Sequence, residues 1–209
     1  MSLSLAVMYN TAVVFMMTGR LDEAEVLLRD AAAHFSKHTT DGYVLKLNER
    51  KGLDLRILND MGEVALRKGY VTAALKFFHQ VYDSQDSCEG ELHPTLVPLK
   101  LNMGRALTKL GRFAEAQTLL LEVIMVYTDW WGRHHMETMR AIDELAWIFM
   151  AEGKERQAAN EIGELELQNA EDLWKEALSF CRSIDGERPD MVVRIQANLQ
   201  YLYTLRQPP

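Results

Sequence analysis

The sequence predicts an all-α fold, a right-handed solenoid of stacked antiparallel helix hairpins. Two observations support this prediction. The 209 residues include only 12 glycines and 5 prolines, so helix-forming residues dominate the chain. One layout of small and large residues also recurs four times, and recurrence at a period of 20 to 50 residues is typical of repeat architectures.

The repeated layout has four positions. A small residue stands seven positions before a glycine, an alanine follows five positions after the glycine, and a large apolar residue comes four positions later. In order, the four copies are Ala12, Gly19, Ala24, Leu28; Gly62, Gly69, Ala74, Phe78; Gly104, Gly111, Ala116, Leu120; and Ala146, Gly153, Ala158, Ile162. The glycines are 50, 42 and 42 residues apart.

Each position of this layout has a physical role in a helix hairpin. The small residue lets the second helix approach the first closely. The glycine ends the first helix in the left-handed conformation that other residues adopt only with strain. The alanine lies where the helices cross, and the large residue fills the space beside it. One hairpin cannot bury its apolar face alone, so the units must stack.

This pattern resembles the tetratricopeptide repeat family, and the 42-residue period resembles its longer kinesin-light-chain type. That type has a Gly-x-x-His-Pro-x-Thr-Leu motif before each first helix. Residues 89–96 match the motif well, residues 132–139 match it in part, and residues 186–191 form a weaker third copy. The resemblance implies a fold of stacked hairpins and a role in binding other proteins.

The repeats are expected to form a single solenoid over residues 1–209. The expected bounds are about 4–38, 53–86, 94–128 and 137–183, with a capping helix at 189–206 and a break at 39–42. In the fourth repeat, the apolar spacing predicts one long helix from about 155 to 183. The alternative is a pair of helices interrupted at Gly163.

First helices line the concave side of a solenoid, where such proteins bind their partners. Projecting the helical period selects the candidate groove residues: Arg56, Asn59, Glu63, Arg67, Asn102, Arg105, Lys109, Arg140, Asp143 and Trp147. The cations suggest an acidic peptide, because arginine binds carboxylates bidentately. The asparagines could bind its backbone, and Trp147 could hold an apolar anchor. The alternative is a solvated face, with Trp147 packed between helices.

Other functional classes are disfavoured. A net charge of −7 disfavours nucleic-acid binding. The phosphate-loop, dinucleotide, zinc-protease and serine-hydrolase motifs are missing from the sequence, so we expect neither an enzyme nor a cofactor. His34 and His38 have no further ligand at metal spacing, so a metal site is not expected either. His134 and His135 are expected to stabilise a turn.

The cysteines and the longest apolar run near the start bear on the location of the protein, and the tryptophan pair bears on its packing. Cys88 and Cys181 are far apart and suit a reducing compartment, so a cytoplasmic location is expected. The apolar run at 12–17 is too short to span a membrane. Burial is expected for the Trp130–Trp131 pair, because large aromatic residues are mostly buried.

These features predict a non-enzymatic scaffold or adaptor that binds a peptide or partner protein in the concave groove. One alternative is a self-associating array that forms homo-oligomers through apolar solenoid ends, or a sensor segment of a larger assembly. The apolar residues at these ends are Leu3, Leu5, Val7 and Met8, and Leu199, Tyr201, Leu202 and Tyr203. A further alternative is an enzyme that uses the groove as a substrate pocket.

Overall fold

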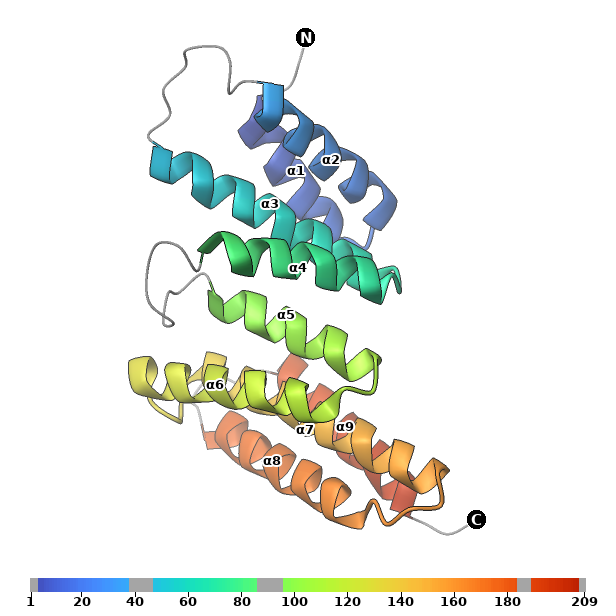
Figure 1. The fold of residues 1–209 in the computed structure, drawn as a ribbon. Helices are drawn as coiled ribbons and strands as arrows, with labels where there is room; N and C mark the ends of the chain where they lie inside the picture. Colours follow the sequence, from blue (N-terminus) through green and yellow to red (C-terminus); the bar gives the residue numbers. More distant parts are fainter. Residues whose placement is uncertain (1–3, 38–46, 86–95, 184–188, 207–209) are drawn as a thin grey trace. The chain divides into compact units, whose positions relative to one another are not determined.

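The computed structural model describes residues 4–37, 47–85, 96–183 and 189–206, and helices are the only regular structure in these ranges (Figure 1). The predicted all-α class is therefore confirmed. The chain divides into two compact units, Met1–Asn102 and Met103–Pro209, which are described in turn. The predicted loop motif at 89–95, the break at 39–42 and residues 186–188 lie outside the described ranges. The single solenoid domain with its repeat bounds stays a prediction.

The first unit consists mainly of two helix hairpins. Helices α1 (Leu5–Met17) and α2 (Leu21–Lys37) form one, and α3 (Leu47–Arg67) and α4 (Val71–Gln85) form the other. Helix α2 packs against α3, so the hairpins share one apolar core. The buried residues of this core are Met8, Ala12, Met16, Ala24, Leu28, Ala31, Ile57 and Val64.

Small residues of the first helices bring the second helices close. A Cβ atom built on Gly62 would overlap the ring of Phe78, and one built on Gly104 would overlap Leu120. Phe78 and Leu120 are fully buried. A side chain larger than hydrogen at either glycine would therefore force the facing side chain or the two helices to shift. The predicted role of the small residue is confirmed at both positions.

The glycines of the first three copies end their helices as predicted. Gly19, Gly69 and Gly111 have φ values of 79°, 87° and 71°, in the region that other residues enter only with strain. In each case the next helix begins two residues later.

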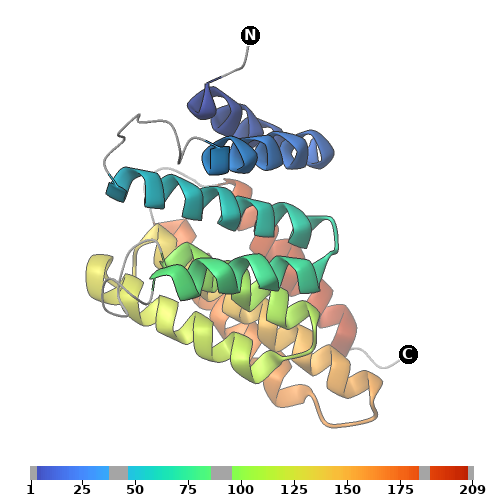
Figure 2. The same cartoon turned by 45° about the horizontal axis from the view of Figure 1, so that its top comes forward.

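The second unit contains the end of α5 (Leu96–Lys109) and four further helices. These are α6 (Phe113–Trp131), α7 (Met136–Ala158), α8 (Glu164–Ser183) and α9 (Pro189–Arg206). Helix α7 packs against α6 and α8, and α9 packs against α8 and, less extensively, α7. The orange and red ribbons of α7 to α9 can be followed in Figure 2.

The loop between α6 and α7 is stabilised as the sequence suggests. The Nδ1 atom of His135 accepts a hydrogen bond from the Glu137 backbone N–H (3.3 Å), so His135 caps α7. The hydroxyl of Thr138 donates to the Gly132 carbonyl (3.0 Å). The turn-stabilising role predicted for His135 is confirmed.

The fourth repeat differs from its prediction. A long helix over 155–183 is wrong, and the alternative break at Gly163 is confirmed, because α7 ends at Ala158 and α8 begins at Glu164. Asn160 turns the chain with φ 59°, a conformation that asparagine adopts more readily than most residues. Gly153 does not end α7. It lies inside the helix, where a Cβ atom would come within 2.9 Å of the Gly163 carbonyl oxygen.

The alanine and large apolar positions of this repeat therefore lie further along the chain. Ala158 is exposed, and Ile162 is 85% exposed. Ala170 and Trp174, also four residues apart, are both 0% exposed. Ala170 and Trp174 thus form a buried alanine–large pair of α8, and Leu167, also 0% exposed, is the large residue that a Cβ atom on Gly153 would meet.

The burial of these residues predicts that two truncations change the free energy of unfolding by very different amounts. Trp174→Ala should lower the free energy of unfolding by about 3–5 kcal/mol, because a buried indole is lost. Ile162→Ala should change it by less than about 0.5 kcal/mol, because the side chain is already in solvent. Urea unfolding followed by circular dichroism measures both. A larger loss for Ile162→Ala than for Trp174→Ala would contradict the assignment.

Candidate functional site

The ten predicted groove residues are divided equally between the two units. Arg56, Asn59, Glu63, Arg67 and Asn102 belong to the first, and Arg105, Lys109, Arg140, Asp143 and Trp147 belong to the second. A groove continuous across both sets stays a prediction.

In the first unit, several of these side chains bind one another or the backbone. Arg67 donates to the Met16 carbonyl oxygen at the end of α1 (2.7 Å) and pairs with Glu63 at 3.8 Å. The Asn102 amide, which is 6% exposed, donates to the Asn59 side-chain oxygen (3.3 Å). These groups therefore connect neighbouring helices of the unit.

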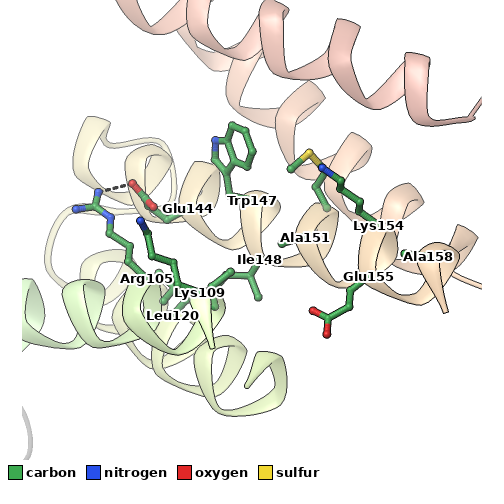
Figure 3. Close-up of a pocket in the computed structure, with 12 residues that line it drawn as sticks. Arg105, Lys109, Leu120, Glu144, Trp147, Ile148, Ala151, Lys154, Glu155 and Ala158 are labelled. Carbon is green, nitrogen blue, oxygen red and sulfur yellow. Dashed lines mark hydrogen bonds and ion pairs between the residues drawn. The ribbon is translucent and has the colours of Figure 1, made fainter. Parts of the chain in front are cut away.

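The second unit contains a pocket of about 500 Å³ (Figure 3). It lies along α5 and α7, the first helices of successive hairpins, and Leu120 of α6 closes part of its wall. Its lining residues are Arg105, Thr108, Lys109, Leu120, Glu144, Trp147, Ile148, Met150, Ala151, Lys154, Glu155 and Ala158. The wall is mostly apolar, and the charged side chains stand around it.

Three cations and two carboxylates line the pocket, although the whole chain carries a net charge of −7. Arg105 forms an ion pair with Glu144. The Nζ atom of Lys154 donates to the Tyr201 hydroxyl (2.9 Å). Within the described ranges, Lys109 has no carboxylate in ion-pair distance. Lys109 is therefore the cation of this pocket most available to a ligand.

Trp147 forms one wall of the pocket and also packs inside the unit. Its ring meets that of Trp174 edge to face, with centroids 5.6 Å apart and an interplanar angle of 84°. In the amide orientation that satisfies both partners, the Asn198 side-chain oxygen accepts from Trp147 Nε1 (3.1 Å). Trp147 thus combines the two environments that the sequence left as alternatives.

Asp143 lies beneath this surface rather than on it. It is 1% exposed and accepts hydrogen bonds from Trp174 Nε1 (2.8 Å) and Arg194 (2.5 Å). Burial raises the pKa of Asp143, against the opposing charge of Arg194. Its carboxylate therefore connects α7 to α8 and α9 and does not face a ligand.

Three of the four predicted groove arginines already have carboxylate partners. Arg67 pairs with Glu63 and Arg105 with Glu144, while Arg140 pairs with Glu137 at 2.8 Å. Glu137 precedes Arg140 by three residues, a spacing that the sequence could have revealed.

Sequence reasoning also missed the pocket residues from Lys154 to Ala158. They follow Trp147 at the helical period, but ending the helix at Gly153 removed them from consideration. Burial of the Trp130–Trp131 pair was a wrong prediction, since the two side chains are 39% and 48% exposed.

The described residues contain no group of three or more potential His, Cys, Asp or Glu metal ligands. None of the helices in these ranges is long and apolar enough to cross a membrane.

A second buried carboxylate, Glu171 of α8, binds α9. It is 6% exposed and accepts from Lys175 Nζ (2.6 Å), from the Tyr203 hydroxyl (2.9 Å) and from Arg206. Burial raises the pKa of Glu171, but these three partners outweigh burial and hold the pKa below its ordinary value.

Because the folded-state pKa is lowered, Glu171 contributes stability above its unfolded-state pKa of about 4.5 and loses that contribution as the pH falls through the lowered value. Glu171→Gln should therefore lower the melting temperature at pH 7 and reduce its fall on acidification below pH 4.5. Thermal unfolding at several pH values tests this, with Asp30→Asn, at an exposed position of α2, as the control. A wild-type pH dependence in Glu171→Gln would refute it.

Comparisons with known proteins agree with this architecture. A family model described as tetratricopeptide repeat matches residues 5–30 and 98–122. The structure of BtubC (BKLC) from P. vanneervenii superposes with a TM-score of 0.69 at 16% identity, over 92% of this chain and 69% of that one. Repeats of a putative kinesin light chain from Podosopora anserina superpose with a TM-score of 0.67 at 20% identity, over 96% and 85%. No curated protein matches the sequence. The family model thus marks tetratricopeptide-type segments at residues 5–30 and 98–122, within a fold of helix hairpins like that of the solved repeat structures.

Proposed function

We propose that this protein is a non-enzymatic interaction scaffold and that the pocket between α5 and α7 binds an extended peptide segment of a partner protein. Tetratricopeptide repeats act generally as protein-interaction scaffolds, and repeat arrays bind along the surface that their first helices form. The observation that carries the proposal is the pocket itself, a cavity of about 500 Å³ with an apolar wall and cations around it.

The chemistry of the pocket indicates what the peptide must offer. An apolar side chain would pack against Trp147, Ile148 and Ala151, where its burial is favourable. A carboxylate on the neighbouring residue of the peptide could reach Lys109. Arg105 could assist only by sharing its bond to Glu144. The ligand we expect is therefore a peptide that combines apolar and acidic residues.

Lys109→Glu should lower the affinity for such a peptide at least tenfold, which corresponds to about 1.4 kcal/mol of binding free energy. The measurement is fluorescence anisotropy at low salt with the full chain and a fluorescein-labelled hexapeptide of alternating glutamate and leucine. Lys76→Glu, at an exposed position of α4, makes the same change in net charge and should leave the affinity within twofold. A peptide of alternating lysine and leucine should bind more weakly than the acidic one. Equal affinities of Lys109→Glu and the wild type would refute the proposal.

Self-association is a second candidate, supported by the exposed face of α1. Val7, Val14 and Met17 are 45%, 54% and 81% exposed, and contiguous apolar exposure often marks an interaction surface. At the other end of the chain, Leu199 and Leu202 are buried in the packing of α9. Tyr201 and Tyr203 on the same helix are 39% and 42% exposed, so both α1 and α9 offer exposed residues to a second copy. Light scattering that shows a monomer at high concentration would exclude self-association.

A further inference from the structure

Two side chains that line the pocket are held by α9. Trp147 donates its indole N–H to Asn198 (3.1 Å), and Lys154 donates to the Tyr201 hydroxyl (2.9 Å). Asn198 and Tyr201 are three residues apart and therefore lie on the same side of α9. This helix is absent from the lining of the pocket, yet it holds two of the residues that form it.

The same contacts form a closed circuit that joins α9 to α7 and α8. Arg194 pairs with Asp143, Asp143 accepts from Trp174, and Trp174 packs edge to face on Trp147. Trp147 donates to Asn198, whose amide nitrogen donates to the Arg194 carbonyl oxygen (3.2 Å). Displacing α9 would break this circuit at two points, Arg194–Asp143 and Asn198–Trp147, and leave the buried Asp143 without its cation.

Helix α9 docks through one apolar row and leaves its other face open. Met191, Ile195, Leu199 and Leu202 are at most 7% exposed, whereas Val193 is 63% exposed. A helix anchored along a single face can detach without unfolding the hairpins beneath it.

We propose that docking of α9 regulates the pocket: the docked helix fixes Trp147 and Lys154 in the positions that receive the peptide, and the detached helix leaves them free. This inference rests on the proposed peptide-binding function. Fixing both side chains in advance removes an ordering penalty from binding. Because coupling between two equilibria is reciprocal, the bound peptide must in turn favour the docked helix.

Asn198→Leu tests the coupling, because it keeps a side chain of similar volume and removes the acceptor of the Trp147 N–H. It should weaken binding of the alternating glutamate–leucine peptide at least fivefold and shift the indole fluorescence emission of the free protein. Gln200→Ala, at an exposed position of the same helix, should change neither. Unchanged affinity and emission in Asn198→Leu would overturn the inference.

Hydrogen exchange of the wild-type chain gives a test that needs no variant. Saturating peptide should slow amide exchange in residues 189–206 at least fivefold and leave α2 unchanged. Peptide binding without slower exchange in α9 would overturn this inference alone. A wild-type chain that does not bind the peptide would overturn the proposed function and this inference together.

Discussion

The structure depends on close contact between the two helices of each hairpin. Gly62 and Gly104 have no side chain where Phe78 and Leu120 approach, and both large side chains are fully buried. This packing fixes the position of the second helix against the first helix. In the second unit, the first helices α5 and α7 line a pocket together with Leu120, the residue that packs against Gly104.

The charged residues of the predicted groove differ in whether they have a carboxylate partner. Arg67 and Arg140 pair with glutamates of their own helices, and Arg105 of α5 pairs with Glu144 of α7, so these three contribute to structure more than to an open cationic surface. Lys109 differs because the described residues offer it no carboxylate partner. The pocket is also connected to the interior of the unit. Trp147 forms part of its wall, packs on Trp174 and donates to Asn198 of α9. Binding and helix docking therefore share one side chain.

The sequence predicted three hairpins correctly because each has a glycine where the chain needs positive φ. It failed in the fourth, where Gly153 has the same spacing but serves close packing against Gly163 inside a helix. Spacing cannot distinguish these two uses of glycine. That error concealed Lys154 and also Leu167, the large residue that packs against Gly153. The contact between Arg105 and Glu144 was beyond prediction for another reason, since its partners are 39 residues apart and meet only after the hairpins pack.

The central claim is that the small–large contact sets the distance between the helices, and a double-mutant cycle on Gly104 and Leu120 tests it directly. Gly104→Ala adds a Cβ atom that overlaps Leu120, and Leu120→Ala removes the overlapping group. The free energies of unfolding of the wild type, both single variants and the double variant should be non-additive. The double variant should be more stable than the sum of the single losses predicts, by about 1–3 kcal/mol. Additive losses would show that Gly104 and Leu120 act independently and would contradict this account.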